Sequence, residues 1–387
     1  MWKHVAANGL SLLIVLAIAL AGLVAWGQRQ WTSEGPLEQA IFFEVPRGAT
    51  LRQVSEDLEE AGAVSSAMIF RLGTEYADRA GDLRFGSYEI PAGASMETVL
   101  EIVTAGGPSS FRYAATYVLR IEGTGELRLR ERIPGTGEIV ELETFSYEEG
   151  VPALYEELVE NDQITVYRVA IPEGLTSWQI VQGLNQADFL SGEVTDVPEE
   201  GMLAPDTYEV RRGDDRNDLL ARMREAQEQI LAEAWENRED GLPLESPEEA
   251  LILASIIEKE TSVPEERGQV ASVFVNRLER GMRLQTDPTV IYGVTNGRGV
   301  LGRGIRQSEL RDDNPWNTYV IDGLPPTPIA NPGRDAIEAA LNPDETDYVF
   351  FVADGTGGHA FSETLEEHNE NVARWRQIEA ERAASGN

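Results

Sequence analysis

The sequence predicts an α+β protein built from an N-terminal transmembrane helix, a small α/β module, a β-rich insertion and a mixed α/β C-terminal domain. Three observations predict this architecture. An uncharged apolar run opens the chain, a strand–turn–helix pattern occurs three times, and alternating apolar and charged residues fill positions 111–167. Helical periodicity then returns in the C-terminal half, so strands and helices are both expected.

The composition excludes several classes of function. The 387 residues include 32 Lys+Arg and 67 Asp+Glu, a net charge of −35, which would repel nucleic-acid phosphates. There is no cysteine, which excludes disulfides, thiol nucleophiles and thiolate metal ligands. Only three histidines occur, so neither a metal site nor a cofactor is expected, and nucleic acid is not expected as a partner.

The first element is an apolar segment without charge over residues 5–28. About 20 such residues cross a bilayer as a helix. Lys3 and His4 precede it and the acidic bulk follows it, so the positive-inside rule predicts residues 1–8 in the cytoplasm, a membrane helix over 9–28 and the remaining chain in the periplasm. The protein would then be a single-pass protein of the inner membrane. A cleaved signal peptide is the alternative.

A turn pattern with proline, glycine and a hydroxyl residue follows three predicted strands. It reads Pro46-x-Gly48-x-Thr50, Pro91-x-Gly93-x-Ser95 and Pro172-x-Gly174-x-Thr176. Each Ser or Thr is placed to cap a helix whose first inward residue comes four positions later. With a second helix over residues 66–76, the first two copies predict a strand–helix–helix–strand module over 40–106. Its topology is of the kind that binds glycan chains in LysM domains, or it is a common packing unit without a ligand.

The middle of the chain predicts antiparallel strands. Segments 116–121, 126–132 and 138–143 alternate in polarity and are separated by Gly-Thr-Gly turns. They place a β-rich insertion over residues 107–165. A connecting α/β region over 166–245 then contains a helical pattern at 218–236.

The candidate chemistry lies in a domain predicted over residues 246–380. Ser246 and Pro247 open an apolar helix that ends in Glu258-Lys259-Glu260-Thr261. At about 100° per residue the two glutamates point in different directions. Glu260 shares its face with apolar residues, so burial should raise its pKa more, as a general acid requires. The alternative is a pair of solvated glutamates.

One lysine is also unusual. Lys259 is the only lysine besides Lys3, in a chain that otherwise uses arginine. Its compact ammonium could order the neighbouring carboxylates without the bidentate clamp that a guanidinium forms.

Two further helix starts follow. Ser262, Pro264 and Glu265 predict a capped helix that ends at Gly281, and Asp287-Pro288 predicts another helix capped by Asp287. Around this second start lie groups suited to sugar hydroxyls and acetamido groups. These are the side chains of Gln285, Thr286, Asp287 and Tyr292.

Residues 203–376 carry a family resemblance. The strings that carry it are Glu258-Lys259-Glu260-Thr261, Gln285-Thr286-Asp287-Pro288-Thr289-Val290-Ile291-Tyr292-Gly293, Asn317-Thr318-Tyr319, Gly323-Leu324-Pro325-Pro326, Asn331-Pro332-Gly333 and Gly358-His359. They resemble the endolytic murein transglycosylases of the YceG-like family. The anchor and the module over 40–106 match by architecture, whereas residues 111–162 form a longer segment than we expect for this family.

The resemblance implies a lyase that cuts the bond between N-acetylmuramic acid and N-acetylglucosamine within nascent glycan strands. Glu260 would be its catalytic acid and then its base, leaving 1,6-anhydro ends and terminating elongation. Peptidoglycan strands, the inner membrane and the cell-wall synthesis machinery are the implied partners. Further substrate contacts are expected from Glu258, Lys259, Gln285, Thr286, Asp287, Tyr292, Asn317, Tyr319 and His359.

Two other functions remain open at this stage. A muramidase would hydrolyse the same bond and would need a second carboxylate, for which Glu258 and Asp287 are available. A non-catalytic peptidoglycan-binding scaffold would depend on the module over 40–106. For Asn317 and Tyr319, packing within a loop is an equal alternative, and for His359 a structural position after a strand is another.

Overall fold

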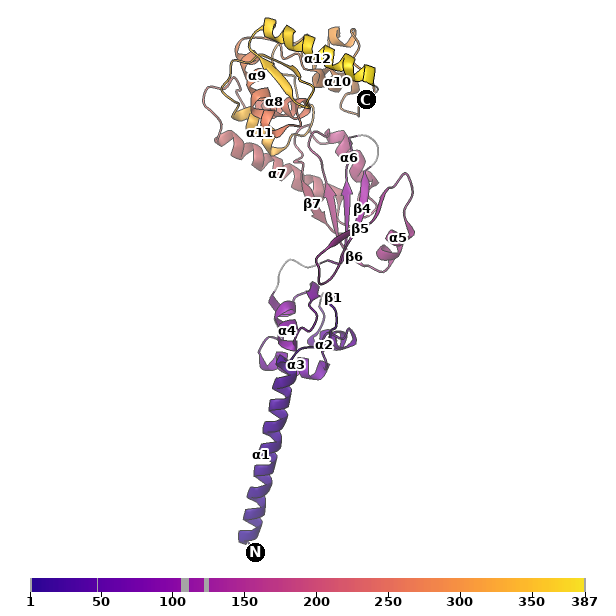
Figure 1. Cartoon of the computed structure of the whole chain (residues 1–387), viewed down its shortest axis with the longest axis vertical. Coiled ribbons are helices and arrows are strands. Elements are labelled where there is room, and N and C mark those ends of the chain that lie inside the picture. Colours follow the sequence, from indigo (N-terminus) through magenta and orange to yellow (C-terminus); the bar gives the residue numbers. More distant parts are fainter. Residues whose placement is uncertain (1, 47, 106–110, 122–124, 386–387) are drawn as a thin grey trace. The chain divides into compact units, whose positions relative to one another are not determined.

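The computed structural model describes residues 2–46, 48–105, 111–121 and 125–385, and Figure 1 shows the chain. The chain divides into two compact units. Unit 1 comprises Met1–Ala114, Leu129–Glu143 and Leu154–Val166. Unit 2 comprises Ala115–Arg128, Thr144–Ala153 and Tyr167–Asn387.

Unit 1 begins with helix α1 (Trp2–Thr32), which is longer at both ends than the predicted span. Its part Leu13–Thr32 has a mean hydropathy of 1.5 and is long enough to cross a membrane. None of this window is buried inside the protein. A membrane anchor and a signal sequence share these properties, so the helix is a candidate span.

A small α/β module follows the helix. It contains β1 (Ile41–Val45), α2 (Leu51–Glu60), α3 (Ala67–Tyr76), β2 (Gly86–Ile90) and α4 (Met96–Ala105). The predicted strand–helix–helix–strand order is confirmed. Strands β1 and β2 pair antiparallel with Ile41 opposite Ile90. The helices pack one apolar face each onto a core that includes Phe43, Leu58 and Phe70.

The three turn motifs have the predicted geometry. Gly48, Gly93 and Gly174 have φ values of 76°, 67° and 77°, in the left-handed region that favours glycine. In each motif the hydroxyl accepts a backbone N–H from three residues ahead, which caps the helix that follows. The residues four positions after the caps, Val54, Val99 and Ile180, are all fully buried.

A five-stranded sheet lies in the middle of the sequence. Its order is β5-β4-β3-β6-β7. The strands are β3 (Tyr113–Val118), β4 (Glu126–Arg132), β5 (Ile139–Ser146), β6 (Ile164–Ala170) and β7 (Thr207–Val210), with α5 (Ala153–Glu160) between β5 and β6. The three predicted strands are confirmed within a few residues. The sheet also includes β6 and β7, which pair antiparallel.

The rest of unit 2 is mainly helical. It contains α6 (Ser177–Gln186), α7 (Arg216–Glu236), α8 (Pro247–Glu260), the 3-10 turn η1 (Pro264–Glu266), α9 (Arg267–Glu279), α10 (Asp287–Thr295), η2 (Glu309–Arg311), α11 (Arg334–Leu341), the hairpin β8 (Phe350–Ala353) and β9 (His359–Ser362), and α12 (Leu365–Ser385). Helix α8 lies among α7, α9 and α11 (Figure 1), and its residues from Ala250 to Ile257 are buried in their shared core.

The helix starts in this unit differ in part from those predicted. Ser246 caps α8 by accepting the N–H of Glu249, as expected. Ser262 does not cap the next helix, because the chain there is extended and enters α9 through η1, whose N-terminus has no side-chain cap. The capping role predicted for Asp287 is also wrong, since Asp287 is already the first residue of α10 and its carboxylate bonds elsewhere.

Candidate active site

The end of α8 points its two glutamates in different directions, as the helical spacing predicts. Glu260 accepts a hydrogen bond from the hydroxyl of Thr286. Glu258 accepts the backbone N–H of Gly333 at 3.1 Å. The two carboxyls therefore have different hydrogen-bond partners.

The surroundings of Glu260 favour its protonated form. Burial raises the pKa of its carboxyl above the ordinary value, and the nearby Asp287 carboxylate adds to that rise. The Thr286 hydroxyl opposes it, and the charges of His359 and Arg277 lower the pKa further. Burial also raises the pKa of Glu258. A proton on Glu260 at pH values above the ordinary carboxyl range is what a general acid requires.

The Thr286 hydroxyl that bonds Glu260 belongs to a cluster of three buried threonines, with Thr289 and Thr318. The N–H of Thr286 donates to Thr318 Oγ1 at 3.0 Å. Thr289 Oγ1 donates to the carbonyl of Thr286 at 2.7 Å and lies 2.9 Å from Thr318 Oγ1. The preceding residue, Gln285, is exposed and adopts a φ of 48°, and its N–H bonds the carbonyl of Thr318 at 3.2 Å. These bonds set the direction of the Thr286 side chain.

Asp287 and Tyr319 form a pair beside Glu260. The Tyr319 hydroxyl donates to Asp287 Oδ1 at 2.7 Å. Burial raises the pKa of Tyr319, and its hydrogen bond to Asp287 and the charge of Glu260 act in the same direction. The phenol therefore stays protonated and keeps Asp287 as an acceptor. This arrangement brings two predicted substrate residues next to the candidate acid.

His359 also belongs to this group and is held by a residue that the sequence did not single out. Glu266 accepts both the backbone N–H and the ring Nδ1 of His359, each at 2.8 Å. Gly358 permits this approach, since a Cβ there would lie 2.3 Å from Glu266 Oε1. The His359 ring packs edge-on against Phe351 at 5.2 Å. The hairpin β8–β9 thus presents His359 near Glu260.

Arg277 is a second residue that the sequence did not single out. It lies on the buried stripe of α9, four residues after Val273, and this spacing was the available signal. Its Nε donates to the carbonyl of Val349 at 2.7 Å, and its Nη1 donates to that of Leu284 at 2.5 Å. Its guanidinium also lies over the ring of Phe350. Arg277 thus ties the segment before Thr286 to the start of β8.

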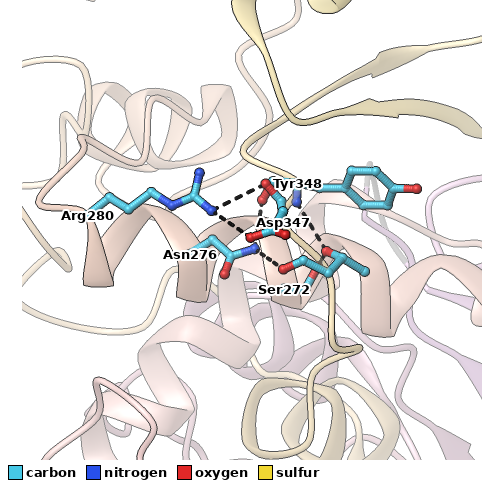
Figure 2. A network of polar contacts seen from close by, with 6 residues as sticks. Ser272, Asn276, Arg280, Asp347 and Tyr348 are labelled. Carbon is cyan, nitrogen blue, oxygen red and sulfur yellow. Dashed lines mark hydrogen bonds and ion pairs between the residues drawn. The ribbon is translucent and has the colours of Figure 1, made fainter.

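Polar side chains along α9 fix the loop segment that leads into β8. Figure 2 shows this network. Ser272 Oγ lies 2.7 Å from Thr346 Oγ1, and Asn276 Nδ2 donates to the carbonyls of Thr346 and Tyr348 at 2.8 and 2.9 Å. The backbone of residues 346–348 is therefore anchored on one helix, which positions the hairpin that carries His359.

Other predicted site residues form hydrogen bonds with groups other than Glu260. Lys259 Nζ donates to the carbonyl of Gly174 at 3.1 Å, and its charge opposes the rise that burial causes in the pKa of Glu258, so its role in ordering the carboxylates stays a prediction. The Tyr292 hydroxyl bonds Glu200 at 3.1 Å. Asn317 is buried and donates to the carbonyls of Glu309 and Asp312, which is the loop-packing alternative. Across the described part of the chain, no group of three His, Asp or Glu side chains is placed to hold a metal ion.

Comparison with known families identifies the family of this chain. The sequence pattern of the YceG-like family matches residues 43–132 and 144–374, well over half of the chain. The chain belongs to the YceG-like family. The gap in the match, residues 133–143, lies at the turn between β4 and β5 and in the first part of β5, inside the segment that is longer than expected for this family.

The curated relatives of this YceG-like protein share the same name. A protein of Bacillus subtilis (strain 168) named endolytic murein transglycosylase is 28% identical over 329 residues, covering 85% of this chain and 83% of the relative. A protein of the same name from Streptococcus pneumoniae serotype 2 (strain D39) is 28% identical over 398 residues, covering 96% of this chain but 65% of the relative. A crystal structure of a yceG-like protein from Listeria monocytogenes is 26% identical, covers 86% of this chain and 98% of that chain, and has a TM-score of 0.46.

Proposed function

We propose that this YceG-like protein is a membrane-anchored lytic transglycosylase that cuts peptidoglycan strands internally. The names of its curated relatives support murein as the substrate. The observation that carries the proposal is the end of α8, where burial raises the pKa of Glu260 and the Thr286 hydroxyl donates to its carboxyl. A carboxyl whose pKa is raised keeps its proton to higher pH than an ordinary carboxyl and can deliver it to a glycosidic oxygen.

The reaction needs only this one carboxyl group. Protonated Glu260 gives its proton to the oxygen that links N-acetylmuramic acid to N-acetylglucosamine, and that bond breaks. The acetamido group of the muramic acid stabilises the cation-like sugar. The Glu260 carboxylate, which accepts the Thr286 hydroxyl, then removes the proton of the sixth-carbon hydroxyl. That oxygen closes onto the anomeric carbon, which gives the 1,6-anhydro end and returns the proton to Glu260.

Neighbouring side chains suit the sugar substrate. Tyr319, Asp287 and His359 lie around Glu260 and supply phenol, carboxylate and imidazole groups for sugar hydroxyls. The Gln285 side chain is exposed in the same loop. Helix α1 would anchor the body outside the cytoplasmic membrane, and the module of α2, α3 and α4 would bind glycan, in line with its strand–helix–helix–strand order. Nascent strands and the cell-wall synthesis machinery are then the proposed partners.

The products of digestion distinguish the lyase from a hydrolase. Purified protein acting on sacculi should release fragments that end in anhydro sugars, which mass spectrometry detects as ends one water lighter than reducing ends. A muramidase would instead use Asp287 or Glu258 as a second carboxylate. Asp287 already accepts the Tyr319 hydroxyl, and Glu258 accepts the Gly333 N–H. Products with reducing ends throughout would overturn the lyase proposal.

Replacing Thr286 should shift the pH dependence of the reaction. The Thr286 hydroxyl lowers the pKa of Glu260, so Thr286→Val should raise that pKa further. Because activity requires the protonated acid, the alkaline limb of the pH–rate profile should move to higher pH. Thr295→Val is the matched control, since the hydroxyl of this threonine donates to the carbonyls of Ile291 and Tyr292 within its own helix α10. An unchanged or lower alkaline limb in Thr286→Val would contradict the prediction.

A further inference from the structure

One face of α3 exposes large apolar side chains. Met68, Leu72 and Tyr76 have exposed fractions of 63%, 52% and 93%. They are spaced four residues apart, so at about 100° per residue they form one stripe about 80° wide along the helix. Large apolar side chains gathered on one exposed face indicate a binding surface more often than singly scattered ones do.

The end of α1 is packed against the same helix. The rings of Trp31 and Phe70 lie 6.0 Å apart, and Ser65 Oγ donates to Gln30 at 3.3 Å. Gly73 permits the close approach of α1, since a Cβ there would lie 2.2 Å from the Trp31 ring. Figure 1 shows α3 directly at the end of α1. The apolar helix and the exposed stripe are therefore parts of one unit.

The segment that joins α1 to the module is also held in place. The N–H of Gly35 donates to the carbonyl of Gly93 at 3.1 Å, and the N–H of Gly93 donates to the carbonyl of Leu37 at 2.9 Å. The module therefore does not move freely on a linker. Its orientation relative to α1 is set by these bonds and by the Trp31 contact.

The three faces of α3 follow one another around the helix. Taking Met68 as zero and about 100° per residue, the stripe ends near 80°, Gly73 lies near 140°, and Phe70 and Thr74 lie near 200° and 240°. Phe70 and Thr74 are buried in the module and Gly73 faces Trp31. The stripe thus lies on the side opposite the module's core and next to the helix that leaves the module.

We infer that α3 lies on the outer surface of the membrane that α1 crosses, with Met68, Leu72 and Tyr76 inserted among the lipid headgroups. Continuity with the apolar helix identifies the lipid surface as the occupant, since the segment Leu13–Thr32 ends at the residues that α3 contacts. The inference rests on the proposed membrane anchor. The stripe would offset the repulsion between this acidic chain and an anionic membrane, and it would hold the module at a constant height above the bilayer.

Spin labelling tests this placement directly, because the chain has no cysteine that would compete for the label. The full-length protein is reconstituted in vesicles of phosphatidylethanolamine and phosphatidylglycerol with one nitroxide at Leu72→Cys, Glu56→Cys or Val15→Cys. Glu56 is an exposed residue of α2 and serves as the matched control. Collision rates with oxygen, which enters lipid, and with a water-soluble nickel chelate then give the depth of each label.

We expect the ratio of oxygen to nickel collisions at residue 72 to be severalfold higher than at residue 56. Equal ratios at 72 and 56, with a membrane-type ratio at residue 15, would overturn the placement of α3 and leave the anchor intact. A water-type ratio at residue 15 would overturn the anchor itself. A label at residue 72 that is shielded from both reagents would show a protein occupant, either a second copy or a partner, and would also overturn the lipid contact.

Discussion

Glu260→Gln is expected to lower the release of soluble fragments from sacculi by about 10²- to 10⁴-fold, the usual contribution of a general acid. The amide keeps the size and the hydrogen bond with Thr286, but it cannot give a proton to the glycosidic oxygen. Binding of glycan should remain, because the neighbouring groups are unchanged. The measurement is the rate of fragment release by purified full-length protein, together with cosedimentation with sacculi.

Two further variants complete this test. Glu279→Gln, at the exposed end of α9, is the matched control and should leave the rate unchanged. Glu258→Gln addresses the muramidase alternative, and its rate should exceed that of Glu260→Gln by a wide margin, because its carboxyl bonds Gly333 instead of facing Thr286. Equal activity of Glu260→Gln and the parent would show that Glu260 is not the catalyst and would favour the scaffold alternative.

Arg277→Leu is expected to lower the free energy of unfolding by about 2–6 kcal/mol. The substitution leaves the buried carbonyls of Val349 and Leu284 without their donor, and each unsatisfied acceptor costs about 1–3 kcal/mol. The segment before Thr286 should also lose its position, so the rate of fragment release should fall. Urea-induced unfolding in detergent, followed by tryptophan fluorescence, measures the change in stability.

The control is the residue that follows α9. Arg280 pairs with Asp347 at 3.3 Å (Figure 2), and both side chains are exposed. An exposed ion pair contributes less than about 1 kcal/mol, so Arg280→Leu should change stability little. A loss in Arg277→Leu no larger than that in Arg280→Leu would show that the buried guanidinium does not hold this part of the site together.

The local features of the fold were predictable from sequence. The turn glycines, such as Gly48 and Gly174, and the caps formed by Thr50 and Thr176 depend on a few consecutive residues, and the structure confirms them. The prediction that Ser262 caps a helix failed because the chain there enters α9 through the 3-10 turn η1, whose N-terminus has no side-chain cap.

The candidate site was predictable only in part. Spacing along α8 separates Glu260 from Glu258, and the structure shows them in different surroundings. The residues around Glu260 were harder to predict. Glu266 bonds His359 from 93 positions away in the sequence, and Arg277 donates to backbone carbonyls rather than to a carboxylate. Backbone acceptors carry no signal in the sequence.

The amino-acid order is enough to predict the charge of −35, the apolar helix at the N-terminus, the three capped turns and the helix that ends at Glu260. These follow from composition, from periods of a few residues and from the backbone preferences of glycine and proline. The folded chain was needed to show that Thr286 bonds Glu260, that Lys259 bonds Gly174, and that α1 packs on α3 beside an exposed stripe. Such contacts join segments distant along the chain, and their geometry depends on how whole helices pack.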